Sequence, residues 1–390
     1  MPKTFNDLYD EICSFGNLFE AARKAGLGKR HKPYVDRFRL DLERQLWTLR
    51  DELLSGAYRP GPYCAFQISE PKIRMISAAP FRDRVVHHAL CNVIEPLWER
   101  RFVSESFANR KALGSSAARD HFAKGVVRYE YVLHLDFRKF FPSLDHEVMK
   151  NQFRRVVRCR QTLALMDTIV DGSNMQEPAD WHFDGDELWT PFERRHGLPL
   201  GNQTSQFFAN VYLDPLDHFV KEVLRCGHYA RYVDDLALFA RSKDDLRVWR
   251  RRIESESAGL RLRLHPAKSR VFRCSEGVTF LGVRFWPGRR RIAAENARRA
   301  KRRLRKLVEG WSRGEVEGET VRRSWRGWVG HAAQANASGF IDALRGQARR
   351  WRADGEGGVS RGPRRGLEQS SNQRAMCESQ QESTREQEYE

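Results

Sequence analysis

Residues 232–235 read Tyr-Val-Asp-Asp and lie between two short apolar runs, Tyr229-Ala230-Arg231 and Leu236-Ala237-Leu238-Phe239-Ala240. Both runs are rich in aromatic and aliphatic residues, which predicts two strands with the acidic pair at the bend between them. Two carboxylates repel each other by about 1 kcal/mol at 4 Å in water, and by more where water is excluded. A structural turn more readily uses Asn-Gly or Asp-Gly. The repulsion is explained if a divalent cation binds here, and a solvated acidic turn is the ordinary alternative.

A third carboxylate is expected at the end of another strand. Residues 129–137 alternate so that Val132, His134 and Asp136 share one face, and Asp136 precedes Asp234 by 98 residues. Three carboxylates on adjacent strands can hold two Mg²⁺ about 3.5–4 Å apart, the arrangement used for in-line nucleotidyl transfer. Mg²⁺ keeps several waters, so few protein ligands suffice, and Mn²⁺ can substitute for it.

The overall charge points to a polyanionic partner. The 390 residues contain 69 Lys and Arg against 51 Asp and Glu, a net charge of +18, for which nucleic acid is the simplest partner. The seven cysteines form no C-x-x-C pair, which fits a reducing cytoplasm better than a disulfide framework or a zinc ribbon. We expect no membrane span, because no apolar run approaches the roughly 20 residues that one needs. We also expect no signal peptide, because the N-terminus lacks the apolar stretch of one.

Basic residues that could hold phosphate groups occur at three places. If Ile73 and Met75 face inward in a strand, Lys72 and Arg74 share the other face and could bind a triphosphate, with a basic strand edge as the alternative. Candidates for gripping a nucleic-acid backbone lie in a polar turn and on a basic amphipathic helix that starts near residue 293 and is expected to end at Gly310. They are Arg110, Lys111, Arg298, Arg302 and Arg305.

The spacing of apolar residues and the positions of glycines predict the remaining helices and strands. Apolar residues from Val35 to Leu53 predict one long helix that Gly56 stops, and residues 146–170 and Phe207 to about Leu224 are also expected to be helical. Residues 279–285 are expected to form one strand containing a glycine. Residues 171–196 are interpreted as an inserted loop with short strands.

The order of these segments resembles that of a reverse transcriptase from about residue 33 to 345. The segment Lys72-Ile73-Arg74 looks like the fingers strand that holds the dNTP triphosphate, and Leu135-Asp136-Phe137 with Phe140-Phe141 looks like the first catalytic motif. The sequence Tyr232-Val233-Asp234-Asp235 is similar to the family's Tyr-x-Asp-Asp box. His265-Pro266-Ala267-Lys268 resembles the loop whose lysine can protonate pyrophosphate, and Phe280-Leu281-Gly282 looks like the primer grip.

The resemblance implies roles for single residues. Asp136, Asp234 and Asp235 bind the two metal ions, the carbonyl of Phe137 completes a metal shell, and Lys268 is a candidate general acid. Phe141 takes the steric-gate position that excludes a ribose 2′-hydroxyl. Lys72 and Arg74 hold the dNTP phosphates, and the segment containing Leu200, Gly201 and Gln206 lies near the nascent base pair.

One departure from the usual sequence pattern of bacterial reverse transcriptases indicates a subtype of the family. Most bacterial reverse transcriptases have Gln-Gly-x-x-x-Ser-Pro before the long palm helix, whereas this chain has Leu200-Gly201-Asn202-Gln203-Thr204-Ser205-Gln206. This variant is typical of the enzymes of diversity-generating retroelements, which misincorporate opposite template adenine. That family's partner is a small, basic, oligomeric four-helix accessory protein. Antiviral-defence and group II intron-like reverse transcriptases, and a non-catalytic RNA-binding scaffold, remain alternatives.

The resulting expectation is an α+β right-hand polymerase with α/β fingers and palm. N-terminal helices and fingers occupy residues 1–128, a palm with an antiparallel sheet packed on helices occupies 129–290, and an all-helical thumb occupies 291–350. Residues 351–390 are expected to be a disordered tail. The enzyme is expected to be cytoplasmic, of bacterial or phage origin, and to act on template RNA, an RNA/DNA hybrid and dNTPs.

Overall fold

The computed structural model describes residues 5–29, 32–68, 74–173, 177–179 and 181–356, with side chains to residue 353. The expected mixed helix and sheet fold with antiparallel sheets is confirmed. Lys72 and Ile73, together with the tail after Glu356, lie outside the described residues.

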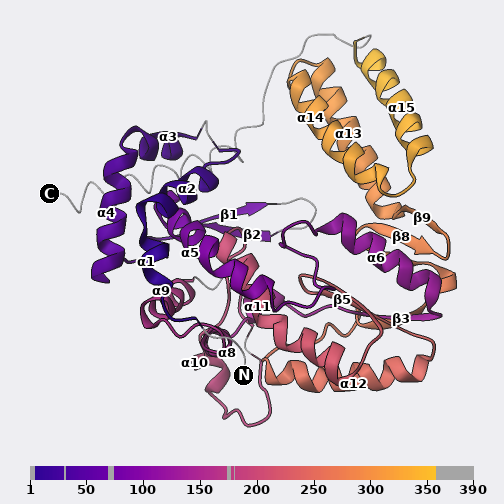
Figure 1. Cartoon of the computed structure of the whole chain (residues 1–390). Coiled ribbons are helices and arrows are strands. Elements are labelled where there is room, and N and C mark those ends of the chain that lie inside the picture. The colour runs from indigo at the N-terminus through magenta and orange to yellow at the C-terminus, as the bar shows by residue number, and fades with distance from the viewer. Residues whose placement is uncertain (1–4, 30–31, 69–73, 174–176, 180, 357–390) are drawn as a thin grey trace.

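The described residues before Arg100 contain five helices, among which α2 packs against α5 (Figure 1). The expected single helix from Val35 to Leu53 is instead broken at Asp41, which has φ −129° and ψ 39° and lies at the junction of the two pieces. The Asp41 side chain makes no capping hydrogen bond to the second piece and instead pairs with Arg44, so the break is in the backbone conformation of Asp41. Gly56 ends the second piece in the left-handed region, as predicted. The helices are α1 (Tyr9–Cys13), α2 (Phe15–Ala25), α3 (Pro33–Leu40), α4 (Leu42–Ser55) and α5 (Phe81–Glu99).

A two-stranded antiparallel ribbon lies between α4 and α5 in the chain. It consists of β1 (Cys64–Ile68) and β2 (Arg74–Ala78). The prediction of a shared face for Lys72 and Arg74 depended on Met75 facing inward, but Met75 is 43% exposed. Arg74 and Met75 are both exposed while Ser77 is buried, so only the far end of β2 is covered by the body of the protein.

The central sheet has the strand order β4-β5-β3-β6 and is antiparallel throughout. Alternate residues of β3 enter different cores, with Leu133 and Leu135 on the face covered by α12 and Val132 on the face covered by α6 (Figure 1). The period-two pattern of residues 129–137 therefore gave the correct faces. The strands are β3 (Tyr131–Leu135), β4 (His228–Tyr232), β5 (Asp235–Ala240) and β6 (Arg270–Arg273).

Helices cover both faces of this sheet. The expected helix over residues 146–170 is interrupted between Arg154 and Arg160, and the helix after Asn202 continues as a π-helical turn over Phe219–Val223. The elements are α6 (Ser115–Arg128), α7 (Phe140–Ser143), α8 (His146–Arg154), α9 (Arg160–Asp171), α11 (Gln203–His218) and α12 (Lys243–Gly259).

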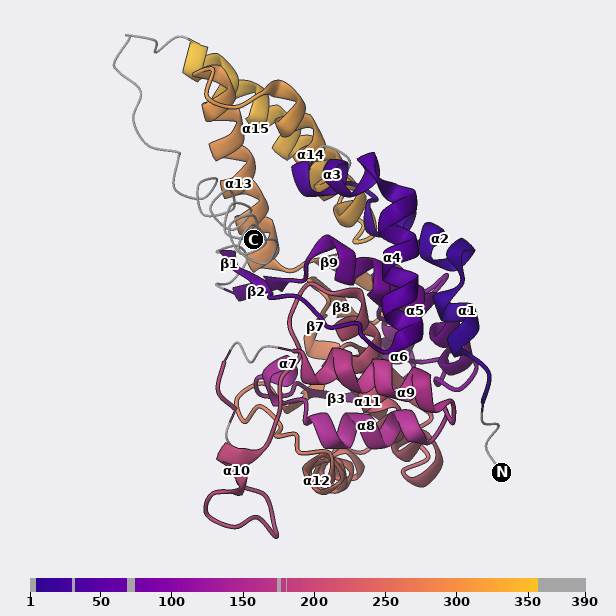
Figure 2. The ribbon, with the colours of Figure 1, turned by 90° about the vertical axis from the view of Figure 1, so that its left-hand side faces the viewer.

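The inserted segment after α9 differs from the expectation. Its described residues contain the short helix α10 (Thr190–Glu193) and none of the expected strands, apart from an isolated bridge between Asp145 and His196. Figure 2 shows α10 on a loop that projects from the body beside α12.

A second antiparallel sheet follows, with strand order β7-β8-β9. The expected single strand over residues 279–285 is instead a hairpin, because Leu281 and Gly282 both have positive φ, 44° and 79°, and reverse the chain. Two consecutive residues with positive φ make the tight turn that matches the twist of a hairpin. The strands are β7 (Val278–Phe280), β8 (Val283–Trp286) and β9 (Arg289–Ile292).

In the described residues after Ala293, three helices form a C-terminal unit that projects away from the central sheet (Figure 1). They are α13 (Ala294–Ser312), α14 (Gly318–Ala333) and α15 (Ser338–Glu356). Gly310 was expected to end α13, but it is buried within the helix, and a Cβ there would lie 2.8 Å from Cγ2 of Val316. Helix α15 continues six residues past the expected boundary at residue 350. None of the helices in the described part of the chain has the length and apolar character needed to cross a bilayer.

Candidate active site

The acidic pair lies at a two-residue turn. Tyr232 pairs with Asp235 across the β4–β5 ladder, which leaves Val233 and Asp234 at the tip. Val233 has φ +58°, a left-handed conformation that is unusual for a β-branched residue and costs roughly 1–3 kcal/mol. The hairpin expected from the sequence is confirmed, and its turn is strained.

A buried ion pair holds the hairpin from behind. Arg231 and Asp217 are both fully buried, and the guanidinium group donates hydrogen bonds of 2.6–2.9 Å to both carboxylate oxygens. Arg231 also donates to the side chain of Asn210 and to the carbonyl of Val233. It therefore links the strained turn to α11. Sequence reasoning missed this group, although a charged residue in the apolar run before the acidic pair was a signal.

Asp136 follows β3 directly and lies beside this hairpin. The last rung of the β3–β5 ladder joins Leu135 to Leu236, so Asp136 and Asp235 are the next residues on two neighbouring strands. The backbone carbonyl of Asp136 accepts a 2.7 Å hydrogen bond from the amide of His265. Both carboxylate oxygens of Asp136 lie 2.9 Å from Nζ of Lys268. The structure thus brings together two expected groups that are 132 residues apart in the chain.

Electrostatic coupling joins these groups to the hairpin. Burial raises the pKa of the Asp234 carboxyl, and the negative charge of Asp136 raises it further, while Lys268 and Arg74 oppose the shift. The charges of Asp136, Lys268 and Arg74 thus all act on the carboxyl group of Asp234. A cation placed beside Asp234 and Asp136 would relieve the unfavourable interaction between them.

Residues expected near the dNTP lie on neighbouring segments. Arg74 is exposed at the start of β2, and the carbonyl of Leu200 accepts a 3.1 Å hydrogen bond from the amide of Ser77 on that strand. Gly201 has φ +120°, and a Cβ there would lie 3.0 Å from Cγ2 of Ile76. The turn before α11 therefore packs on β2. Gln206 is exposed on the first turns of α11.

The aromatic residues after Asp136 form a cluster. The Phe137 ring is buried and stacks on Phe140, with centroids 5.8 Å apart, and Phe141 packs edge-on against Phe140 at 5.3 Å. Phe141 is only partly buried. Its ring therefore lies at the edge of the core that supports Asp136.

Among the candidate nucleic-acid contacts, Arg110 has a different role from the one expected. Its side chain is 8% exposed and donates to the carboxylate of Glu99 and to the carbonyls of Val103 and Ser106. The guanidinium holds the loop after α5 and is not presented to a partner. Lys111 is exposed.

The candidates on α13 are placed as the helical pattern predicted. Arg298, Arg302 and Arg305 are all exposed, while Leu304 and Val308 are buried on the other side of the helix. Arg305 forms a 2.7 Å ion pair with Glu309.

The side chains of Asp136, Asp234 and Asp235 do not form a preassembled metal-binding site. Within the described ranges, no three His, Cys, Asp or Glu side chains are grouped so that they could hold a metal ion. The donor chemistry nevertheless fits a hard cation, because Asp136, Asp234 and Asp235 offer only oxygen ligands. The Lys268 ammonium already provides a positive charge beside Asp136.

Most of the helical C-terminal unit was foreseen, but its attachment to the body was not. Arg119 on α6 is 3% exposed and donates to the carbonyl of Leu281 at 3.2 Å and to the side chain of Gln334. Its guanidinium also lies 3.1 Å from Nδ1 of His331. One side chain thus joins α6, the β7–β8 turn and α14.

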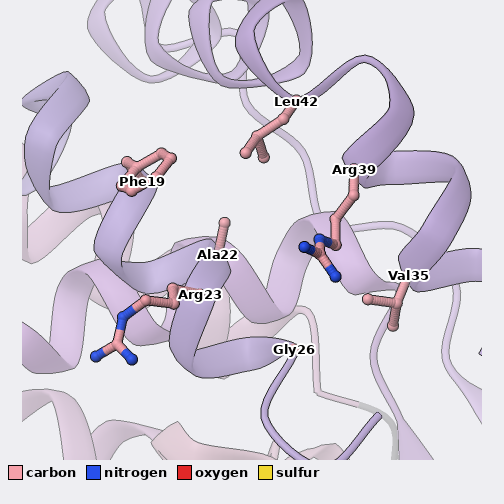
Figure 3. Close-up of a pocket in the computed structure, with 7 residues that line it drawn as sticks. All are labelled: Phe19, Ala22, Arg23, Gly26, Val35, Arg39 and Leu42. Carbon is pink, nitrogen blue, oxygen red and sulfur yellow. The ribbon is translucent and has the colours of Figure 1, made fainter. Parts of the chain in front are cut away.

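A separate pocket of about 100 Å³ lies on the N-terminal helices (Figure 3). Most of the residues that line it are apolar, and Arg23 and Arg39 are the charged ones. It contains no carboxylate and lies on α2, α3 and α4, which carry none of the acids at the end of the central sheet. We therefore place the chemistry at the acidic hairpin and not in this pocket.

Comparison with known proteins assigns the chain to a family. The model of the family described as reverse transcriptase (RNA-dependent DNA polymerase) matches residues 68–285, which is more than half of the chain. The chain belongs to the reverse transcriptase family and is an RNA-directed DNA polymerase, a nucleotidyltransferase. It therefore acts on a nucleic-acid template and dNTPs, and enzymes of this family generally use divalent metal ions.

Two curated proteins are similar to it. Protein YkfC of Escherichia coli strain K12 is 28% identical over 316 residues, covering 68% of this chain and 79% of that protein. Nuclear intron maturase 1, mitochondrial, of Arabidopsis thaliana is 30% identical over 110 residues, covering 27% of this chain and 16% of that protein. The alternative of a non-catalytic scaffold is not supported, because the family is enzymatic.

Proposed function

We propose that Asp136, Asp234 and Asp235 hold two Mg²⁺ ions and that this site copies RNA into DNA. The observation that carries the proposal is the meeting of β3 and the β4–β5 hairpin, which places Asp136 next to the acidic pair. When bound, the ions supply activation of the attacking 3′-hydroxyl and stabilisation of charge on the phosphates. Mn²⁺ is expected to substitute for Mg²⁺.

The residues around the acids are proposed to bind and orient the substrate. Arg74, with Lys72, binds the dNTP phosphates, and Arg74 already acts electrostatically on Asp234. Lys268 donates a proton to the leaving pyrophosphate after it separates from Asp136. The carbonyl of Phe137 completes a metal shell, and the Phe141 ring excludes a ribose 2′-hydroxyl.

The arrangement of the chain is proposed to be that of a right-hand polymerase. In this assignment, residues 1–128 form the N-terminal helices and fingers, residues 129–290 the palm, and the helices from residue 291 the thumb. The exposed Arg298, Arg302 and Arg305 on α13, with Lys111, contact the RNA/DNA hybrid.

Primer extension on an RNA template tests the site. Wild-type protein is expected to extend a DNA primer with dNTPs and Mg²⁺, to be inhibited by chelation, and to recover when Mg²⁺ or Mn²⁺ is restored. Phe141→Ala is expected to incorporate rNTPs, whereas Phe192→Ala, an exposed aromatic outside the site, should leave the preference for dNTPs intact. Equal use of rNTPs by wild type and Phe141→Ala would contradict the role of Phe141.

We further propose that the enzyme belongs to a diversity-generating retroelement. Leu200 stands where most bacterial relatives have Gln, and an apolar side chain near the nascent pair gives up hydrogen bonds that discriminate between bases. The retroelement's small, basic four-helix accessory protein is then the proposed partner. A near-duplicate repeat pair that differs at adenines in the neighbouring DNA would support this assignment, and its absence would contradict it.

The error pattern provides the biochemical test. Leu200→Gln is expected to reduce misincorporation opposite template adenine, and sequencing of the cDNA measures it. The matched control is Leu188→Gln, which changes a leucine that is 70% exposed on the inserted segment. An unchanged adenine error rate in Leu200→Gln would defeat the proposed role of Leu200.

A group II intron-like enzyme is the second candidate function. The similarity to an intron maturase over 110 residues favours it. A reverse transcriptase of this kind is expected to copy template adenine as accurately as the other bases. The same cDNA sequencing therefore separates the two candidates, and an antiviral-defence role would instead appear as protection of a host against phage.

A further inference from the structure

We propose that Trp181, on the inserted segment between α9 and α11, is a positioning residue that holds Asp136 and Lys268 in register for nucleotide addition. The proposal rests on the proposed roles of Asp136 and Lys268. It assigns a function to a segment that the polymerase chemistry leaves unexplained.

The Trp181 ring contacts the side chains of two arginines. The Arg138 guanidinium lies 4.4 Å from the ring centroid and the Arg263 guanidinium 5.4 Å from it. The indole N–H donates a 3.2 Å hydrogen bond to the hydroxyl of Ser143 on α7. Arg263 also donates to the carbonyl of His182. The ring is therefore held by two guanidinium contacts and by the hydrogen bond from its N–H group.

The two arginines belong to the segments that carry the proposed catalytic groups. Arg138 is two residues after Asp136, and Arg263 is five residues before Lys268. The amide of Arg138 donates a 2.8 Å hydrogen bond to the carbonyl of Arg263, and the amide of His265 donates to the carbonyl of Asp136. A shift of one segment along the other would therefore change the 2.9 Å contacts between Asp136 and Lys268.

A second ring strengthens the same contact. Phe183 lies 5.4 Å from the Arg263 guanidinium and 5.7 Å from that of Arg261. Asp186 accepts hydrogen bonds from Arg194 and Arg261, and its side chain is 2% exposed. Burial raises the pKa of Asp186, but the hydrogen bond from the Phe183 amide and the two guanidinium groups together lower it to about 2. The inserted segment is thus attached to the segment after α12 at both Arg261 and Arg263.

Ordinary packing does not explain why these groups meet. Arg138 and Arg263 are exposed cations on paired segments, and like charges in such positions repel each other. Each guanidinium group is attracted to the Trp181 ring, and these attractions offset the repulsion. The Trp181 ring therefore favours the paired register in which Asp136 and Lys268 face each other.

The test compares two tryptophans of one segment. Trp181→Ala removes the ring that contacts both arginines, Trp181→Phe retains a ring, and Trp189→Ala removes a tryptophan that is 66% exposed. Each full-length protein is assayed for single-nucleotide addition on an RNA template, for RNA affinity and for thermal unfolding. Asp136→Asn is measured in parallel.

We expect Trp181→Ala to lower kcat by about 10- to 100-fold, because small displacements of reacting groups have effects of this size. The KM for dNTP, the RNA affinity and the unfolding temperature should stay near the wild-type values. Trp181→Phe should recover most of kcat, and Trp189→Ala should match the wild type.

Three results would overturn the proposal, provided that Asp136→Asn is inactive. They are an unchanged kcat in Trp181→Ala, an equal loss in Trp189→Ala, and a loss that Phe does not restore. If Trp181→Ala unfolds, the kcat of Trp181→Phe is the test instead. The proposal predicts that this variant, which retains a ring, keeps kcat within a few-fold of the wild type, and a larger loss would overturn it. An active Asp136→Asn would instead overturn the proposed active site itself.

Discussion

At the scale of single residues, the ion pair between Lys268 and Asp136 is the most informative contact. The sequence suggested separate roles for the two side chains but not that they would touch. A pattern of residue types shows which groups carry charge, whereas the pairing depends on the register between β3 and the segment after α12. For the same reason Arg110 was misinterpreted, since nothing local to it indicates that Glu99 accepts its hydrogen bonds.

Removing the Lys268 ammonium should strengthen metal binding. In the proposed site, a metal ion competes with this ammonium for Asp136. An ion pair this exposed is worth up to about 1 kcal/mol, so Lys268→Met should bind Mn²⁺ up to about 5-fold more tightly. Paramagnetic resonance titration without nucleic acid measures this affinity. Arg270→Met, a cation exposed on β6, is the control, and weaker binding in Lys268→Met would contradict the prediction.

His218 predicts how stability changes with pH. The Asp214 carboxylate 3.5 Å away, and that of Glu222 at 2.6 Å, raise the pKa of His218 from 6.5 to about 9 in spite of partial burial. Because the folded state binds this proton more tightly, the stabilisation is complete below pH 6.5 and is lost as pH rises to about 9.

The His218 side chain is 34% exposed, so screening limits its contribution to about 1 kcal/mol or less. His218→Gln should therefore lose stability at pH 6.5 and show little change at pH 9.5. Thermal unfolding across this range measures the effect. A difference between the two proteins that grows with pH would contradict it.

At the scale of elements, the acidic hairpin was predicted correctly because its apolar runs and turn are local in the sequence. The strained Val233 and the ion pair behind it were not predictable, since Arg231 and Asp217 lie on different elements. The local sequence pattern also predicted two elements that are longer than those observed. Asp41 divides an apparently continuous helix, and the turn at Leu281 and Gly282 divides an apparent strand.

Breaking the ion pair behind the hairpin should destabilise the protein strongly. Arg231→Met leaves the Asp217 carboxylate buried without its cation, which costs about 3–5 kcal/mol in comparable cases. The free energy of unfolding in urea measures this loss, and Arg231→Met with Asp217→Leu should recover much of it. A loss below about 1 kcal/mol in Arg231→Met would show that the pair does not support the turn.

At the scale of the whole molecule, composition and motif order indicated a mixed fold that binds nucleic acid. They did not indicate how the C-terminal helices meet the central sheet. That junction depends on Arg119, whose partners lie between 162 and 215 residues away along the chain. Contacts over such distances leave no local periodicity.

Weakening the contacts between the C-terminal helices and the central body should shorten the cDNA products. Arg119→Met removes the hydrogen bonds to Leu281 and Gln334, so the proposed thumb should hold the hybrid less firmly. We expect fewer nucleotides to be added per binding event, with addition of the first nucleotide little changed. Arg128→Met, an exposed arginine of the same helix, is the control, and equal product lengths for the two variants would contradict the role of Arg119.

The most direct measurement is single-turnover primer extension by Asp234→Asn on an RNA template, with RNA affinity measured on the same preparation. Because bound metal ions supply several kcal/mol of stabilisation to the transition state, extension should fall by roughly 10³-fold or more while RNA binding persists. Extension by Asp234→Asn at a rate close to that of the wild type would contradict the assignment of the acidic hairpin as the catalytic centre.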